Sequence, residues 1–186
     1  MIKFIAILFL SIPGIVHGEY KNTNGAALEK SFFEMLKWIR SDQEPVLASI
    51  EISPQWKDLN LLEDDNYAIW IGHSTFLIKK NGVSILTDPI FSERASPFKN
   101  IGPKRLISAA IPLQAIPKID YVTISHNHYD HLDINSLIAI SEKHPETIFL
   151  VPAGDADLLK RKRINNVFEF EWWQSYKDKE IEFTFT

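Results

Sequence analysis

Cysteine is absent from all 186 residues of the chain. Its absence excludes disulfide bonds within the chain, a lipid-modified cysteine anchor and thiolate ligands for a metal ion. A basic stripe is also lacking, because 24 acidic residues outnumber 20 basic ones and leave a formal net charge of −4. The cationic run Lys160–Arg163 is expected to end a helix and face solvent. Nucleic acid is therefore not expected as a partner.

The N-terminal apolar run is too short to cross a membrane. It extends from Phe4 to Val16, follows the positively charged start Met1–Lys3, and is interrupted by a serine, a proline and a glycine. A bilayer span requires roughly 20 residues. With Val16 and Gly18 placed for cleavage, residues 1–18 are predicted to be a secretory signal peptide, although a buried N-terminal helix stays open. We therefore expect an exported protein, periplasmic or secreted.

The histidines, by contrast, are concentrated in one segment. Three of the six histidines and two aspartates lie within Ser125–Asp133, in the pattern His-x-His-x-Asp-His. This cluster follows the apolar run Ile119–Ile124, which is typical of a strand. Imidazole nitrogens and carboxylate oxygens are preferred ligands of Zn²⁺. The pattern predicts a metal site, and the alternative is a polar surface loop whose histidines cluster by chance.

The spacing of these residues suggests how they divide between metals. His126 and His128 are two residues apart in an extended segment, so their side chains project to the same side and can hold one ion. Asp130 and His131 follow where the chain must bend toward a helix. Two ligand pairs in adjacent loop positions suit two metals about 3.5–4 Å apart.

Apolar periodicity predicts alternating strands and helices. Helices are expected over residues 26–39, 135–140 (with Asp133 as the N-cap) and 156–161, and strands over 67–71, 75–78, 83–87, 119–124, 147–151, 167–170 and 180–185. Residues 89–118 form a long irregular stretch of the length usual for a functional loop. This interleaving favours an α/β sandwich. The expected organisation is a signal peptide over 1–18, an N-terminal helix and loop over 19–65, and an α/β domain over 66–186.

Several segments resemble those of one enzyme family. They are Trp70–Thr75 (Trp-Ile-Gly-His-Ser-Thr), Leu86–Pro97, Ile101–Arg105, Ile124–Asp133 and the pair Trp172–Trp173. The histidine cluster resembles the metal motif of the metallo-β-lactamase superfamily. The segments together resemble the branch of N-acyl-phosphatidylethanolamine-hydrolysing phospholipases D, from about Tyr67 to the last residue.

The resemblance implies an αββα sandwich with two zinc ions in a cleft at the sheet edges. It implies that His126 and His128 are ligands of one zinc, and that Asp130 and His131 are ligands of the other and the catalytic pair. Asp88 matches an aspartate that orients the metal loop from behind the ligands. The alternative for Asp88 is an ordinary turn residue before a proline.

His73 has two open interpretations, a pocket residue or a structural histidine whose hydrogen bonds are satisfied. Ser74 is no candidate nucleophile, because the segment lacks a Gly-x-Ser-x-Gly turn. The activity that the resemblance implies is metal-assisted hydrolysis of a phospholipid, giving phosphatidic acid and an N-acylethanolamine. Residues 89–118 and the helix expected over 26–39 offer a possible peripheral membrane contact.

The resemblance also implies ligands that the chain does not supply. Two zinc ions need about seven ligands, which the family completes from its C-terminal half, and no histidine follows His144. We therefore expect the chain to hold the N-terminal half of the fold, with the C-terminal half missing. Two other possibilities remain open: the same fold cleaving a lactone or another phosphodiester, and an inactive truncated fragment that only binds metal or a partner chain.

On this basis the isolated 186-residue chain should bind zinc weakly and turn over little or no substrate. Metal analysis and a phosphodiesterase assay of the purified chain check this expectation. Two tightly bound zinc ions with fast turnover would contradict it. Reading the coding DNA beyond Thr186 separates a continuing enzyme from a fragment.

Overall fold

The structure is a computed structural model that describes Phe33, Ile52 and residues 54–63, 66–98, 100, 102–178 and 180–186. The predicted signal peptide lies outside the described residues, as does the helix expected over 26–39 except for Phe33. The chain divides into two compact units, Met1–Val46 and Leu47–Thr186. The described part of the chain contains no helix long and apolar enough to cross a bilayer. The predicted boundaries at 18 and 65 stay predictions.

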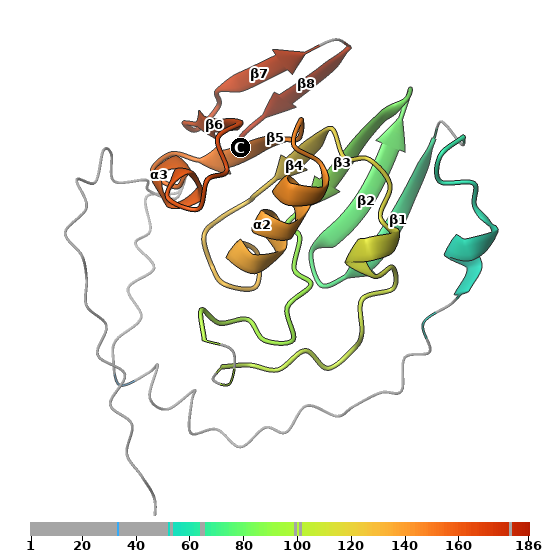
Figure 1. The fold of residues 1–186 in the computed structure, drawn as a ribbon. Coiled ribbons are helices and arrows are strands. Elements are labelled where there is room, and N and C mark those ends of the chain that lie inside the picture. Colours follow the sequence, from blue (N-terminus) through green and yellow to red (C-terminus); the bar gives the residue numbers. More distant parts are fainter. Residues whose placement is uncertain are drawn as a thin grey trace, which may run out of the picture. The chain divides into compact units, whose positions relative to one another are not determined.

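A six-stranded sheet forms the centre of the second unit, with its strands side by side in chain order (Figure 1). The strands are β1 (Tyr67–Gly72), β2 (Thr75–Lys80), β3 (Val83–Thr87), β4 (Tyr121–Thr123), β5 (Ile148–Pro152) and β6 (Val167–Phe170). The first three strands pair antiparallel, and β3 to β6 pair parallel. All six strands were predicted from the sequence, and all six are confirmed.

Local chemistry explains where these elements begin and end. The turn between β2 and β3 is Asn81–Gly82, and both residues have positive φ, 50° and 76°. Such a two-residue turn matches the twist of the flanking strands, which is why Asn-Gly is favoured there. Helix α2 (Ile134–Lys143) connects β4 to β5, and its N-cap is Asp133, whose side chain accepts from Asn135 N. The predicted cap is therefore confirmed.

The parallel part of the sheet is packed on both faces, because successive side chains along its strands point alternately into two cores. Val122 and Phe149 face one core with α2 and α3 (Ala156–Lys160), whereas Tyr121 and Leu150 face the other. The second core is closed by a two-stranded sheet of β7 (Ser175–Asp178) and β8 (Ile181–Thr184) (Figure 1). The layers run from helices to the large sheet to the small sheet, so the predicted α/β sandwich is confirmed.

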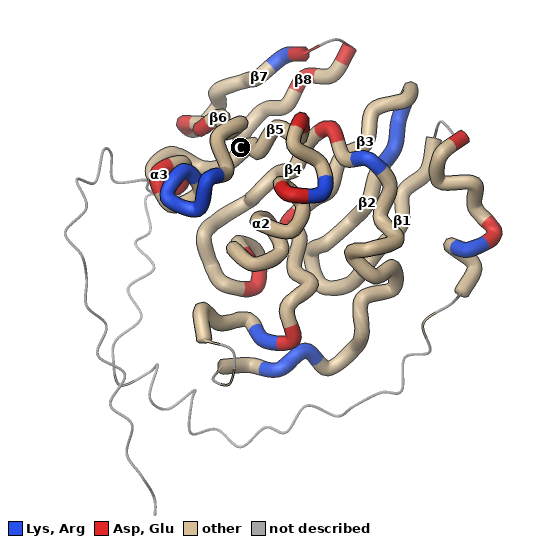
Figure 2. The backbone as a smooth tube through the Cα atoms, viewed as in Figure 1, with Lys and Arg blue, Asp and Glu red and all other residues tan. Residues whose placement is uncertain are grey.

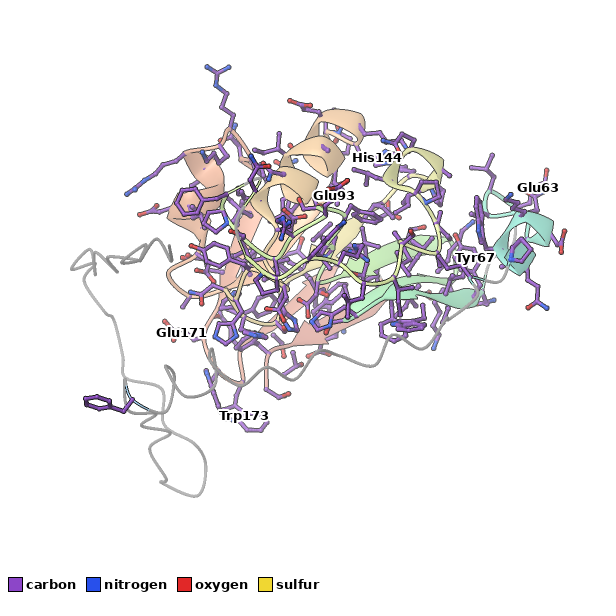
Figure 3. The ribbon with its side chains drawn as sticks, turned by 90° about the horizontal axis from the view of Figure 1, so that it is seen from below. Glu63, Tyr67, Glu93, His144, Glu171 and Trp173 are labelled. Atoms are coloured by element: carbon purple, nitrogen blue, oxygen red, sulfur yellow. The ribbon has the colours of Figure 1, made fainter. Side chains whose placement is uncertain are left out.

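One strand of the small sheet was missed. Residues 180–185 were expected to form a terminal strand, and β8 confirms it, but its partner β7 reads Ser-Tyr-Lys-Asp and has one apolar residue. Tyr176 packs against the second core and the Tyr121 hydroxyl donates to Asp178, so tertiary contacts hold this strand. In the turn before β7, Trp173 points away from the domain (Figure 3).

The segment between β3 and β4 is irregular, as predicted for residues 89–118. It contains the 3₁₀ turn η2 (Leu113–Ala115) and one bridge between Arg94 and Lys104. The Arg105 guanidinium fastens it by donating to the carbonyl oxygens of Ile90, Ser92 and Ile107. Burial lowers the pKa of Arg105, while nearby Asp133 opposes the shift.

The cationic run at the end of α3 faces solvent, as expected. Lys160 ends the helix, and residues 161–163 form an exposed turn on the outside of the unit (Figure 2). Four neighbouring positive charges repel one another unless water screens them, so exposure is the less costly arrangement.

The buried Asp133 carboxylate joins α2 to the segment after β3. It accepts hydrogen bonds from Ser92 N at 3.0 Å, Ser92 Oγ at 2.9 Å, Phe91 N at 3.3 Å and Ser136 Oγ at 2.5 Å, besides its helix cap. Hydrogen bonds to a buried charged acceptor are worth more than neutral ones. This one side chain therefore holds two chain segments together.

We predict that Asp133→Asn lowers the free energy of unfolding by about 2–4 kcal/mol, because an amide accepts at one oxygen and leaves buried donors unsatisfied. Urea denaturation measures the change. Asp58→Asn, at an exposed position in η1 (Pro54–Asp58), is the matched control and should leave stability within about 0.5 kcal/mol. Equal stability of the two variants would contradict the role of Asp133.

Candidate metal centre

The predicted site residues gather at one edge of the large sheet because they follow neighbouring parallel strands. Asp88 comes directly after β3, Ser125 comes soon after β4, and Asp155 comes after β5. The carboxyl ends of adjacent parallel strands meet at the same edge, where α/β proteins commonly bind ligands. The strand order therefore brings together residues that are far apart in the chain.

Asp88 lies behind the histidine loop and is nearly buried, at 6% exposure. Its Oδ1 accepts from Ser125 N at 2.7 Å, and its Oδ2 accepts from Ser125 Oγ at 2.8 Å. Oδ2 also lies 2.8 Å from Nδ1 of His131. The backbone of Asp88 has φ of 37°, a strained conformation for a residue other than glycine. The structure thus places Asp88 in contact with the loop and with one predicted ligand.

These contacts determine which ring nitrogens remain available. A carboxylate only accepts, so His131 donates from Nδ1 to Asp88 and keeps its Nε2 free to bind a metal. The single hydroxyl hydrogen of Ser125 is donated to Asp88. Ser125 Oγ therefore accepts from Nδ1 of His126, 2.9 Å away, which leaves Nε2 of His126 as its ligand atom.

The predicted ligands form a tight group of rings. The ring centroid of His126 lies 4.5 Å from that of His128 and 4.0 Å from that of His131. Burial and the neighbouring imidazoles of His131 and His128 lower the pKa of His126, which favours the neutral form that binds metals. The structure therefore brings together all three histidines of the motif.

Asp130 completes the group and is held ionised. Burial alone would raise its pKa, but a hydrogen bond from its own backbone and the imidazoles of His131 and His73 lower it on balance. Its Oδ2 lies 3.6 Å from Nε2 of His131. Two ligand atoms of one tetrahedral zinc ion stand about 3.4 Å apart at ordinary bond lengths. Asp130 and His131 therefore fit a shared metal ion.

His73 is a member of the centre that the sequence left undecided. Its Nε2 lies 3.0 Å from Oδ2 of Asp130, and its ring meets that of His131 at a centroid distance of 5.1 Å. Ligand atoms of His73, Asp130 and His131 all lie within 4.8 Å of one another. The sequence placed His73 in the turn between two predicted strands. Its contact with Asp130 could not be predicted, because the two residues are 57 positions apart in the chain.

The other side of the loop is attached to the segment after β5. Asn127 Nδ2 donates to Oδ1 of Asp155 at 3.2 Å. Glu169 stands beside it and accepts from Gly154 N and Ala156 N at 3.0 and 2.7 Å. Burial and the nearby Glu169 charge raise the pKa of Asp155, and the bond from Asn127 opposes the shift. Sequence reasoning gave Asn127 and Asp155 no role.

Comparison with known proteins decides the family. Residues 68–186, more than half of the chain, match the sequence model of the Beta-lactamase superfamily domain. The chain belongs to this superfamily. The predicted resemblance to the metallo-β-lactamase superfamily and the predicted α/β fold are both confirmed.

The named relatives are longer than the match. An uncharacterised protein of Mycobacterium tuberculosis is 40% identical over 60% of this chain and 30% of its own length. A Caenorhabditis elegans protein named N-acyl-phosphatidylethanolamine-hydrolyzing phospholipase D 1 is 36% identical over 61% of this chain and 33% of its own length. The chain thus spans about a third of these relatives.

A solved structure of similar fold is that of CmlA, a diiron beta-hydroxylase from Streptomyces venezuelae. It is 22% identical to this chain and has a TM-score of 0.50, and the match covers 64% of this chain and 23% of CmlA. Likeness at this level concerns the fold alone.

The raised pKa of Asp155 leads to a prediction about how the stability of the folded chain depends on pH. Between its unfolded pKa near 3.8 and its higher folded pKa, the folded chain binds more protons than the unfolded chain, so ionisation of Asp155 costs stability as pH rises. Asp155→Asn removes that cost and keeps an acceptor for Asn127. It should be more stable than the parent at neutral pH and equal to it at pH below 3.8. Urea denaturation across pH measures this, with the exposed Asp157→Asn as control. A less stable Asp155→Asn at neutral pH would contradict it.

Proposed function

We propose that this centre is the active site of a metal-dependent hydrolase that cleaves a phospholipid phosphodiester. The observation that carries the proposal is the hydrogen-bonded arrangement around Asp88. It leaves Nε2 of His126, Nε2 of His131 and the Asp130 carboxylate available at one edge of the sheet. Superfamily membership supports a metal-dependent hydrolase, and the name of the Caenorhabditis elegans relative supports the phospholipid substrate.

The residues of the chain would hold and orient the metal ions. His126 and His128 are the proposed ligands of one zinc, and Asp130 and His131 are those of the second. Asp88 fixes the ring orientation of His131 directly and that of His126 through Ser125. When bound, zinc lowers the pKa of water and neutralises the charge that develops on phosphoryl oxygens.

The proposed reaction adds one water to the phosphodiester. The water oxygen bonds to phosphorus, and the bond between phosphorus and the head-group oxygen breaks. That oxygen leaves with a proton as the hydroxyl of the N-acylethanolamine, while the phosphate stays on phosphatidic acid. Atoms and charge balance without a further reactant.

Exposed aromatic side chains beside the centre support a lipid surface as the place of action. Trp70 and Phe76 face each other across β1 and β2 and are 49% and 40% exposed. Tyr129, within the histidine loop, is 55% exposed. The Trp70 indole donates to the backbone oxygen of His73 at 2.8 Å, which ties this pair to the centre. Tryptophan and tyrosine side chains favour the membrane interface, so Trp70 and Tyr129 support the peripheral membrane contact that we propose for an exported protein.

The test is product analysis at high chain concentration, because slow turnover is expected of the chain alone. The chain is incubated with vesicles containing N-acyl-phosphatidylethanolamine in water carrying heavy oxygen, with and without zinc. We expect zinc-dependent phosphatidic acid that carries heavy oxygen on its phosphate, and at least a tenfold loss in His126→Ala.

The other outcomes separate the alternatives. Zinc-dependent cleavage of a lactone or of a soluble phosphodiester, with the lipid left intact, would replace the proposed substrate. No cleavage of any of these compounds would favour the remaining alternative, an inactive truncated fragment, over the enzymatic proposal for this chain. His144→Gln, at the far end of α2 from the centre, is the matched histidine control and should behave as the parent chain does.

A further inference from the structure

We infer that His73 is a positioning residue whose ring fixes the Asp130 carboxylate for metal binding, and is not itself a ligand. This inference rests on the metal centre proposed above and adds a residue to it. It starts from one contact, Nε2 of His73 to Oδ2 of Asp130 at 3.0 Å. The two residues come from different parts of the sheet edge, the β1–β2 turn and the loop after β4.

Distances distinguish hydrogen bonding from shared coordination. A tetrahedral metal ion holds two ligand atoms about 3.4 Å apart, and the pair Asp130–His131 at 3.6 Å suits that geometry. At 3.0 Å, His73 and Asp130 could share a metal only with a ligand angle of about 90°. The same distance is ordinary for a nitrogen that donates to a carboxylate oxygen. The contact is therefore a hydrogen bond, with the proton on Nε2 of His73.

The backbone of His73 has a conformation that residues other than glycine rarely adopt. Its φ is 50°, it follows Gly72 at φ of 140°, and the register of β1 shifts between Trp70 and Gly72. A residue other than glycine is strained in this left-handed region, because its Cβ comes close to the backbone carbonyl oxygen. The indole of Trp70 bonds to the His73 carbonyl oxygen at 2.8 Å and keeps the turn in place. A histidine held in this strained position is typical of a functional side chain.

Asp130 needs such a partner because it is the exposed member of its pair. Its side chain is 41% exposed, whereas that of His131 is 15% exposed and fixed by Asp88. A free carboxylate on an exposed loop samples several rotamers, and metal binding must remove that freedom. The hydrogen bond from His73 selects one rotamer before the metal arrives. Loss of such an outer partner commonly lowers metal affinity by about 10–100-fold.

The experiment is a titration of the full 186-residue chain with Co²⁺, followed by absorption, in three forms. His73→Gly removes the ring and relieves the turn, so folding should be retained; His73→Gln keeps a donor at similar reach. We expect His73→Gly to bind Co²⁺ about 10–100-fold more weakly, and His73→Gln to recover most of that loss. At saturation His73→Gln should have the parent spectrum, because the ligand set is unchanged.

Contrary Co²⁺ affinities or spectra in these variants would overturn the inference. A His73→Gln chain that binds as weakly as His73→Gly, with a changed spectrum, would make His73 a ligand. Unchanged Co²⁺ affinity in His73→Gly would give His73 a structural role only. An equal loss of affinity in the control His144→Gln would show that the loss does not depend on the contact with Asp130. Added to Asp130→Ala, His73→Gly should cause no further loss of Co²⁺ affinity, because His73 acts through Asp130.

A parent chain that binds no Co²⁺ at millimolar metal would reject the inference together with the proposed metal centre. A chain that binds Co²⁺ as described but hydrolyses no lipid would reject only the proposed function.

Discussion

The hydrogen bonds of the Asp88 carboxylate are the contact on which the metal centre depends. Both oxygens are used: one holds the backbone of the loop at Ser125, and the other holds the Ser125 hydroxyl and the His131 ring. The carboxylate is nearly buried, so each bond that it loses leaves a charge in a poorly solvated place. The loop can therefore adopt few conformations, and the ligand atoms of His126 and His131 face the same region.

The sheet makes this contact possible. Asp88 and the loop stand at the ends of β3 and β4, which pair in parallel from Ile85–Tyr121 to Thr87–Thr123. The backbone bond from Asp88 N to Thr123 O, at 2.8 Å, extends that ladder to the first residue of the site. A shift of one residue in the register would turn Asp88 away from the loop. Packing in the two cores fixes the register, and through it the geometry of the metal centre.

Much of this was predictable from the sequence, for reasons that differ between residues. The large sheet followed from apolar runs, from Asn81–Gly82 and from the cap at Asp133, all of which are local signals. The motif around His126 is also local. The role of His73 is not, because its contact with Asp130 forms only when β1 and β4 take their places in one sheet. β7 was missed for the same reason: its sequence is polar, and tertiary contacts at Tyr176 and Asp178 hold it.

Within the described residues the centre is buried and hydrogen-bonded on one side and exposed on the other. Behind it stand Asp88, the His131 ring and the core; in front stand His73 and Asp130, whose side chains are 50% and 41% exposed. The exposed side also carries the Trp70–Phe76 pair and Tyr129, so an apolar surface borders the exposed ligand. The phospholipid that we propose as substrate combines a phosphate with hydrocarbon, so it would meet the exposed Asp130 carboxylate and these aromatic rings together.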